Sequence, residues 1–333
     1  MKHNPNYLVE SFANDGLPHL TLDAGPERNP AGFIGLANEN RFDGAFLSQP
    51  LTEYATGWNG SDEARKLKEL LDFMAPEVPV ARRFEFRTAE NAEALLSETD
   101  DIRAIGSGFK RVEYKGGTTN SKTYNKGLTG VLDKDEMQPG DEELMTSRLI
   151  ARLLRSETRR AATALLAVDN TGTNKTWGSS ADPDGDVLSA IDSGGDSSGL
   201  EPNRVLYGRG AWLLRRSAVA AQATAGAFGG LSIRTPAELA EMLGVEGVMQ
   251  TNLRYQSTAS AKAKIVGAYV VVFNAQANIG KDDPSNIKRF ITRTGSPFQV
   301  FRQEFAKTIE ISVEHYSHIV ATATVGAKKL NIS

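Results

Sequence analysis

Residues 139–170, PGDEELMTSRLIARLLRSETRRAATALLAVDN, carry the most regular pattern in the chain. Apolar residues recur there at spacings of three and four, which predicts one long helix that would span roughly 45 Å. Pro139 and Gly140 end the preceding segment, and the three acids after them suit a helix start, where the helix dipole favours negative charge. The apolar positions are Leu144, Met145, Leu149, Ile150, Leu153, Leu154, Ala161, Ala162, Leu165, Leu166 and Val168.

The predicted helix, taken as residues 140–169, has no residue of a type that binds metals or substrates on its expected apolar face. We therefore interpret it as a structural beam. From periodicity alone, an ordinary long core helix of an enzyme is the alternative. Its arginines could contact phosphate, but a solvated or ion-paired face is the favoured interpretation.

The composition excludes several classes of protein. The chain has 333 residues, of which 40% are hydrophobic, enough for one elaborate domain or two to three subdomains. A net charge of -3 gives no electrostatic reason to expect that the whole chain binds nucleic acid or an acidic membrane. The chain has no cysteine, which excludes disulfides, thiolate metal sites and a cysteine nucleophile. The first residues have no signal-peptide pattern, and no apolar run approaches the roughly 20 residues that span a bilayer.

The first part of the chain alternates between irregular and periodic segments. Residues 1 to about 60 are polar and irregular, which is typical of disorder or of an extended arm ordered against a partner. Residues 61–74 predict an amphipathic helix with Ser61 as its N-cap, and residues 77–88 alternate as a strand does.

Residues 101–133 predict a long basic hairpin, with strands at 102–114 and 122–133 and a tip at 115–121. It has too few apolar residues to be stable alone, so it needs a neighbouring surface. A floppy surface hairpin is the alternative. Its basic residues are Arg103, Lys110, Arg111, Lys115, Lys122 and Lys126.

The second half of the chain predicts a mixture of helices and strands. Residues 171–199 are rich in Gly, Asp and Ser, and we expect a polar connection there. The tail alternates strongly, which is typical of antiparallel sheet with one wet face. The expected elements are strands at 204–207, 245–250, 265–273, 298–305, 307–315 and 319–325, and helices at 210–221 and 235–243.

Several short motifs match catalytic or metal-binding patterns, but each lacks the flanking elements or further ligands that its pattern requires. Ser197 lies in a literal G-x-S-x-G, but its flanks are polar where a nucleophile elbow needs a strand and a helix. Asp182, Asp184 and Asp186 imitate the start of a calcium loop without its later ligands, so a helix N-cap or a turn is expected. The four histidines show no zinc spacing. We expect no catalytic residue, no cofactor and no metal site.

Several segments, in this order, resemble the major capsid protein of tailed bacteriophages, which has the Hong Kong 97-like fold. An irregular arm and a basic hairpin precede one very long helix, and a mixed region and a closing sheet follow it. The local matches are residues 71–80 (LDFMAPEVPV), 103–106 (RAIG, with Ile105 where a related branch has Pro), 134–136 (KDE), 176–187 (the Trp177 and Asp182-Pro183 segment), 201–208 (EPNRVLYG), 211–214 (AWLL) and 239–245 (LAEMLGV).

The resemblance implies an α+β fold with four parts. These are an N-terminal arm with a short helix, a peripheral domain built on the spine helix, an extended β-hairpin loop and a mixed α/β axial domain. The expected ranges are 1–71 for the arm, 72–102, 129–170 and 305–333 for the peripheral domain, 103–128 for the extended loop, and 171–304 for the axial domain.

The resemblance also implies a function in assembly rather than catalysis. Such subunits form pentamers and hexamers that close into an icosahedral phage head around double-stranded DNA, in the virion, after assembly in the host cytoplasm. The implied partners are further copies of the chain, a separate scaffolding protein, a portal and a decoration protein, with non-specific DNA contact and no membrane. The basic hairpin would meet acidic partners, for which the candidates are Asp62, Glu63, Glu142 and Glu143. The alternatives are a cellular nanocompartment shell of the same fold and a hydrolase using Ser197.

Overall fold

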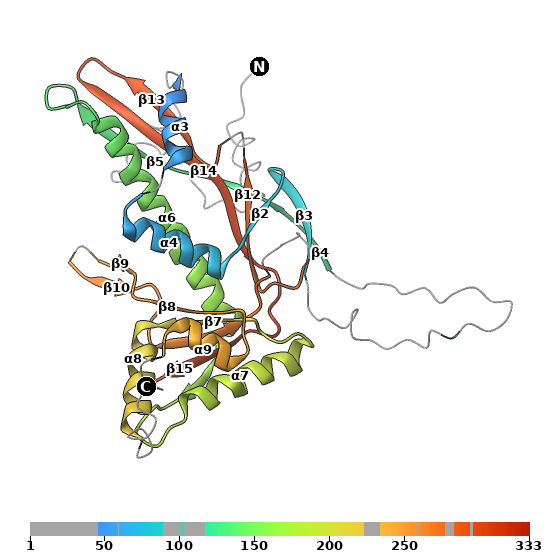
Figure 1. The fold of residues 1–333 in the computed structure, drawn as a ribbon. Coiled ribbons are helices and arrows are strands. Elements are labelled where there is room, and N and C mark those ends of the chain that lie inside the picture. The colour runs from blue at the N-terminus through green and yellow to red at the C-terminus, as the bar shows by residue number, and fades with distance from the viewer. Residues whose placement is uncertain are drawn as a thin grey trace, which may run out of the picture.

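The computed structural model describes residues 46–58, 60–88, 102, 117–222, 234–258, 260–276, 283–293 and 296–333. Two bodies, each built on a β-sheet, are joined by the long helix α6, Asp141–Val168 (Figure 1). This helix confirms the one predicted from the periodicity of residues 139–170. Among the described residues, no helix combines the length and the apolar character needed to cross a membrane.

The first body is a six-stranded sheet organised around β14. The first part of β14 pairs antiparallel with β13 on one side and β5 on the other, and its second part pairs with β12. β1 continues the sheet beyond β13, and β2 lies parallel to β12. The strands are β1 (Phe46–Leu47), β2 (Glu77–Pro79), β5 (Tyr124–Asp133), β12 (Ile287–Thr292), β13 (Gln299–Glu304) and β14 (Thr308–Ala321).

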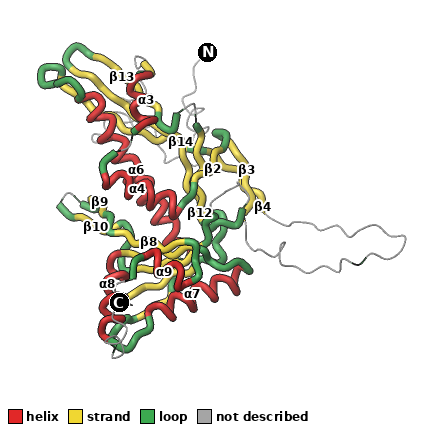
Figure 2. Tube along the Cα trace, in the orientation of Figure 1, coloured by secondary structure: helices red, strands yellow, loops and turns green. Residues whose placement is uncertain are grey.

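Helices α3 (Gln49–Gly57), α4 (Asp62–Met74) and α6 pack with one face of this sheet (Figure 2). Side chains alternate along a strand, so Ile309, Ile311 and Val313 of β14 share the face toward α6, and all are buried. The predicted cap of α4 is confirmed, because the Ser61 hydroxyl accepts a hydrogen bond from the backbone N–H of Ala64.

The second body is a five-stranded sheet in the order β6-β15-β11-β7-β8, with three helices on one face. Val205, Tyr207, Val270 and Val272 face those helices, whereas alternate residues such as Val271 join the core formed with α4 and α6. This sheet is therefore buried on both faces. Its elements are β6 (Thr173–Lys175), α7 (Pro183–Ser198), β7 (Arg204–Gly208), α8 (Arg209–Ala221), α9 (Pro236–Leu243), β8 (Gly247–Thr251), β11 (Tyr269–Phe273) and β15 (Lys328–Ile332).

The α6 helix ends against the second sheet. The Lys329 ammonium of β15 donates to the Leu166 carbonyl at 3.3 Å and the Asn170 carbonyl at 3.0 Å. A cation at a helix C-terminus stabilises it, because carbonyl groups without helical partners gather there. The beam is thus anchored in both bodies.

The expected connection at 171–199 is wrong, because residues 183–198 form α7. Asp182 caps this helix by accepting the backbone N–H of Gly185 at 3.0 Å, and Pro183 occupies the first turn. Val187, Ala190 and Ile191 bury one face at helical spacing. A good cap and this narrow apolar face outweigh the poor helix propensity of the glycines.

The strand predictions need several corrections. Residues 77–88 form two strands, β2 and β3 (Arg83–Thr88). The two strands expected at 307–315 and 319–325 are replaced by the single strand β14, which ends at Ala321. Residues 46–57, expected to be irregular, contain β1 and α3. The core strand expected at 265–273 starts only at Tyr269, and β15 was not predicted. Long-range pairing decides all of these cases.

The expected tip of the basic hairpin is wrong, whereas the pairing of its outgoing strand stays a prediction. This tip forms β4 (Gly117–Lys122), which pairs with β3, and the return strand is β5, which pairs with β14. Residues 103–116 lie outside the described residues. A further two-stranded sheet, β9 (Arg254–Gln256) and β10 (Lys262–Lys264), projects beside α6 (Figure 1).

The expected domain ranges do not follow the two sheets. Residues 62–71, expected in the arm, belong to α4, which is packed on α6 of the same chain with Leu67, Leu70 and Leu71 fully buried. β12, expected in the axial domain, lies in the first sheet, and β15, expected in the peripheral domain, lies in the second. Each sheet thus contains strands from both sides of an expected boundary, and the domain ranges themselves stay a prediction.

Candidate functional site

A buried charged cluster lies between α6 and the first sheet, centred on Glu157. Its carboxylate accepts hydrogen bonds from the Lys126 ammonium at 2.8 Å, the Ser317 hydroxyl at 2.8 Å and the Arg160 guanidinium at 2.6 Å. The His315 Nε2 atom lies 3.8 Å away. The Glu157 side chain is only 3% exposed, so these groups replace the water that a carboxylate needs.

The register of the sheet places these groups together. Lys126 of β5 lies opposite His315 of β14, and Ser317 lies two residues along on the same face. Glu157 reaches them from α6, three residues after Leu154 in the apolar stripe. The cluster therefore joins one helix to two strands at a fixed position along the helix.

The electrostatics of the cluster follow from burial and neighbouring charge. Burial alone would raise the pKa of Glu157, but the nearby His315 ring and the charge of Lys126 outweigh it and hold that pKa well below its usual range. Burial also lowers the pKa of Lys126, while Glu157 opposes that shift. The carboxylate is thus charged, and its stability depends on the cations around it.

A second set of ion pairs lies beside this cluster and joins β12 to α4 and β2. The Arg289 guanidinium donates to Asp72 at 2.7 Å and to Glu77 at 3.1 Å. Arg293 also pairs with Glu77, and Lys68 pairs with Asp72 at 2.7 Å. These contacts fix the second half of the sheet against the helices.

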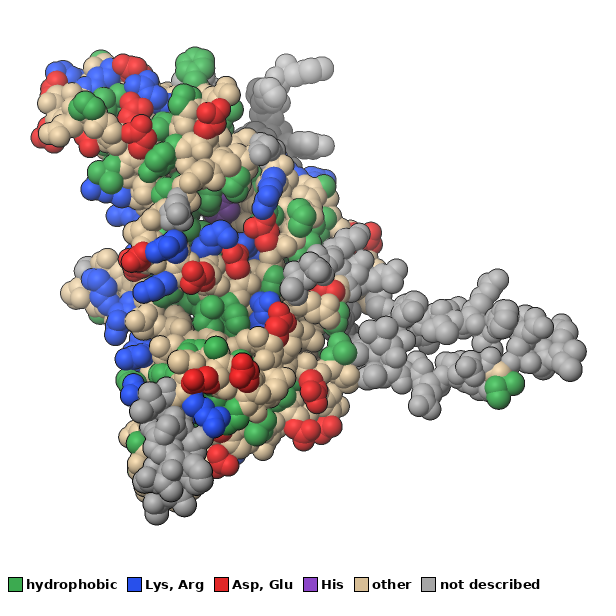
Figure 3. All heavy atoms as spheres, in the orientation of Figure 1, with side chains coloured by type: hydrophobic (Ala, Val, Ile, Leu, Met, Phe, Trp, Pro, Cys, Tyr) green, Lys and Arg blue, Asp and Glu red, His purple; other side chains and the backbone are tan. Residues whose placement is uncertain are grey.

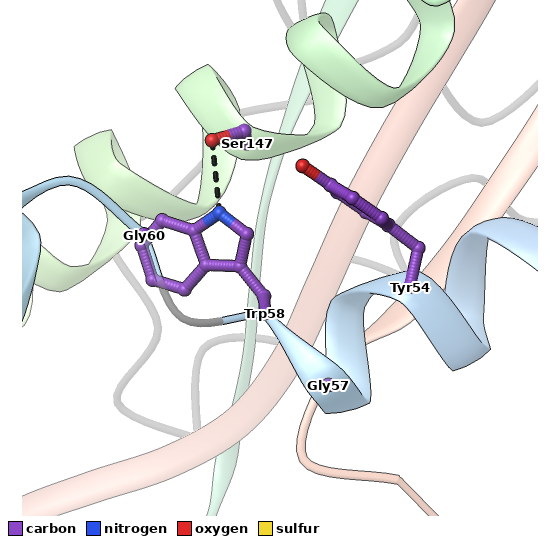
Figure 4. A pocket seen from close by; sticks show the side chains of 5 residues that line it. All are labelled: Tyr54, Gly57, Trp58, Gly60 and Ser147. Carbon is purple, nitrogen blue, oxygen red and sulfur yellow. Dashed lines mark hydrogen bonds between the residues drawn. The ribbon is translucent and has the colours of Figure 1, made fainter.

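A surface pocket of about 420 Å³ lies between the end of α3 and α6 (Figure 4). The indole N–H of Trp58 donates to the Ser147 hydroxyl at 2.8 Å, which ties the segment after α3 to α6. Tyr54 forms the other wall in the same view. The pocket has no titratable group other than Tyr54 in its lining, so its geometry offers packing rather than acid–base chemistry.

The structure places the predicted contact residues differently from the expected loop. Lys126 is mostly buried and paired with Glu157 of its own chain, so it is not a free contact on a protruding loop. Lys122 ends β4, with its ammonium 6.0 Å from the centre of the Tyr124 ring. The remaining basic candidates, Arg103, Lys110, Arg111 and Lys115, lie outside the described residues.

The predicted acidic partners have contacts within the chain. Asp62 pairs with Arg65, Glu63 with Arg155 at 2.7 Å, and Glu142 with Arg302 at 3.1 Å. Glu143 is exposed on the first turn of α6. Contacts of these acids with a basic loop stay a prediction, and for the first three they would compete with the pairs described.

The side chains of the enzyme-like motifs form hydrogen bonds with other residues of the same chain. The Ser197 hydroxyl, on the last turn of α7, donates to the Ser193 carbonyl at 2.7 Å and accepts from Lys328 at 2.8 Å. Asp184 binds Arg215 through two hydrogen bonds, and Asp186 accepts from Trp177 at 2.9 Å. Within the described ranges, no group of three or more His, Asp or Glu side chains could hold a metal ion.

The sequence interpretation missed the cluster because it did not single out Glu157. The spacing did contain a signal, since Glu157 lies three residues after Leu154 and four before Ala161, within the apolar stripe. Its partners were not visible, because Lys126 and Ser317 are brought to it only by strand pairing.

Comparison with solved structures identifies the fold. The chain matches a phage-related protein from Bordetella bronchiseptica RB50 with a TM-score of 0.63 and 18% identity, over 86% of this chain and 97% of that one. The capsid of the cyanophage P-SCSP1u matches at a TM-score of 0.48 and 10% identity, over 79% and 87%. A virus-like particle from Pyrococcus furiosus matches at 0.45 and 12%, over 81% and 94%. The fold assignment rests on the first of these.

The chain has an α+β fold, as predicted, and it shares this fold with the phage-related protein from Bordetella bronchiseptica RB50. A scan against protein-family models found no match, and a search of curated proteins found none either.

Proposed function

We propose that this chain is a major capsid protein, which self-assembles through pentamers and hexamers into an icosahedral phage head around double-stranded DNA. The observation that carries the proposal is the fold, which extends over nearly the whole of a phage-related protein. The order of segments that resembles the capsid family supports the same function.

The open face of the first sheet supports assembly through contacts between copies. Leu47 pairs with Phe301, and that row continues through Ser312 to Thr129, on the face opposite α6. Val131 lies two residues further on the same face, and both Leu47 and Val131 are 54% exposed. We propose these two side chains as contact points between copies of the chain.

The parts of the subunit are proposed as follows. The first sheet with α3, α4 and α6 forms the peripheral domain, and the second sheet with α7, α8 and α9 forms the axial domain. The arm is proposed to precede β1, and the extended loop to connect β3 to β4. Head-to-tail contacts between such subunits generate closed rings when the rotation closes.

The partners and location follow from this role. We propose a separate scaffolding protein, a portal and a decoration protein as partners, and non-specific, salt-sensitive contact with packaged DNA. The subunit would assemble in the host cytoplasm and reside in the virion. Its role would be structural and not catalytic, which the contacts of Ser197 within its own helix support.

The test is mass by light scattering with negative-stain images of the same sample. Rings or closed megadalton particles are expected for the unmodified chain. Val131→Asp is expected to reduce assembly because it places a charge on the open face, whereas the matched control Val131→Thr should assemble. A chain that stays monomeric at high concentration and with its scaffolding protein would overturn the proposal.

A further inference from the structure

The β9–β10 ribbon, residues 254–264, has a positively charged face. Arg254 and Lys264 lie directly opposite one another in its ladder, and Lys262 lies two residues along on the same face. All three side chains are exposed, and residues 252–264 contain no acid. Like charges directly opposite one another in a ladder repel, so a negatively charged partner would stabilise this face.

The ribbon is attached to α6 in a way that turns this face outward. Tyr255, on the other face of the ribbon, packs against the core, and the Arg159 guanidinium of α6 lies 4.9 Å from the centre of its ring. Because side chains alternate along a strand, Arg254, Lys262 and Lys264 point away from α6. Within the described ranges, none of these three cations forms an ion pair.

The last turns of α7 have the opposite charge. Asp192 and Asp196 are exposed four residues apart on the helix, and the exposed Glu201 follows just after it. Carboxylates at this spacing repel one another, and the helix dipole disfavours negative charge near a C-terminus. Lys328 reaches this end by donating to the Ser197 hydroxyl at 2.8 Å, so one cation accompanies three carboxylates. In the part of the chain that the structure describes, none of the three carboxylates forms an ion pair.

The two charged surfaces lie on different sides of the subunit. The ribbon projects on the left of the molecule in Figure 1, whereas α7 runs along the lower right. Figure 3 shows Asp and Glu side chains gathered over that lower right part. Because the surfaces lie apart in one chain, each can neutralise the other only between two copies. A contact between two different surfaces is head-to-tail, and it generates a ring when the rotation between copies closes.

We propose that the basic face of the β9–β10 ribbon binds the acidic end of α7, formed by Asp192, Asp196 and Glu201, on a second copy of this chain. One contact relieves the repulsion within both surfaces. Double-stranded DNA would also fit the ribbon, but it would leave the acidic end of α7 uncompensated. The proposal rests on the proposed function, since it assigns one of the contacts between neighbouring subunits of a ring.

The first test is carbodiimide cross-linking of particles assembled from equal parts of ¹⁴N-labelled and ¹⁵N-labelled chain, followed by mass spectrometry. A carbodiimide joins an amine directly to a carboxylate that it contacts. We expect links from Lys262 or Lys264 to Asp192, Asp196 or Glu201. Linked peptides that contain both labels would show that the link joins two copies. This test needs no substitution, so it does not depend on the folding of a variant.

Charge reversal is the second test. Lys262→Glu with Lys264→Glu should raise the protein concentration needed for assembly about tenfold or more, because like charges then face each other across the contact. Asp192→Lys with Asp196→Lys should have the same effect. All four substitutions in one chain should restore assembly, because the two surfaces have then exchanged their charges. Light scattering measures assembly in each case.

The matched control is Lys66→Glu with Lys307→Glu. It reverses the same number of exposed lysines on the first body, outside the ribbon, and should assemble as the unmodified chain does.

Particles that form without the expected cross-links would overturn this proposal and leave the proposed function standing. The proposal would also be overturned if the fourfold variant assembled no better than either pair of substitutions. A ribbon variant that assembles normally but loses DNA binding would assign the ribbon to DNA instead. A chain that never assembles would overturn both proposals.

Discussion

The two sheets of this protein are stabilised in different ways. The second sheet is buried on both faces, with helices α7, α8 and α9 on one side and the core around α6 on the other. The part of the first sheet around β5, β13 and β14 has helices on one face, and its other face exposes Leu47 and Val131. Between the first sheet and α6 lies a charged cluster whose central carboxylate is almost fully buried.

The two bodies therefore differ in how strictly their contacts fix the position of a helix against the sheet. Apolar contacts stabilise the second body without demanding one exact register, whereas Glu157 must meet Lys126, Ser317 and His315 at one position of α6. A buried ion pair adds little net stability over an apolar pair, but breaking it is costly. The second body has ion pairs too, but Arg215–Asp184 joins two helices, and Lys175–Asp186, which joins β6 to α7, is more exposed than the Glu157 cluster.

The largest effect is expected from breaking the cluster. Glu157→Ala leaves the Lys126 ammonium buried without its carboxylate and should lower the free energy of unfolding by about 3–5 kcal/mol. Urea unfolding measures this loss. The double variant Glu157→Ala with Lys126→Met should recover part of the stability, because it removes the unpaired charge. A double variant less stable than the single one would contradict this account.

A cavity in the second body should cost a similar or slightly smaller amount. Leu239 of α9 is fully buried in the apolar core, and Leu239→Ala should lower the free energy of unfolding by about 2–5 kcal/mol. Hydrogen exchange should show faster opening of β7 and β11. Leu239→Met, which nearly conserves volume, is the control. Exchange that accelerates equally in β5 and β13 would show that the bodies are not distinct.

Acid should weaken the first body through Glu157. The pKa of this group is lower in the folded chain than in the unfolded one, so its stabilising contribution is present above about pH 4.3, the unfolded value. The contribution is lost as pH falls from there toward the folded pKa, at up to about 1.4 kcal/mol per pH unit. Urea unfolding at a series of pH values should therefore give a shallower acid decline for Glu157→Gln. Parallel declines for the two proteins would contradict the assignment.

The smallest effect is expected at a helix end of the second body. Thr235 caps α9 by accepting the N–H of Glu238, whose carboxylate accepts the N–H of Thr235 in return. Thr235→Ala should cost about 1 kcal/mol, and Thr235→Ser should cost far less. Thermal unfolding measures both. An equal loss in the two variants would show that the methyl group, not the hydroxyl, matters.

Local signals predicted α4, α6, α8 and α9 but missed α3 and α7, and they predicted the sheets poorly. The caps at Ser61 and Thr235 and the stripe of α6 are encoded within a few residues, so they could be found from the sequence. The tail was divided in two because Tyr316, Ser317 and His318 interrupt its apolar alternation, yet β14 continues through them with partners on both sides. Pairing with β12 and β5 is information that no local window contains.

The candidate sites show the same limit. In the Glu157 cluster, Lys126 precedes Glu157 by 31 positions in the sequence, and Ser317 follows it by 160. A pocket beside the cluster is lined by residues from six elements. Conversely, Asp182 was expected to cap a helix or form a turn, and it caps α7, because a cap is a contact between near neighbours.

The place of β15 has a consequence for synthesis of the protein. Lys328–Ile332 lies between β6 and β11, away from the edge of the second sheet, and its lysine also closes the end of α6. The ribosome makes Lys328 160 positions after Val168, the last residue of the long helix. A nascent chain therefore exposes an unfinished sheet until residue 332 has emerged, and the completed subunit surface exists only after that moment. The time at which translation ends therefore sets the earliest time at which a contact that involves both bodies can form.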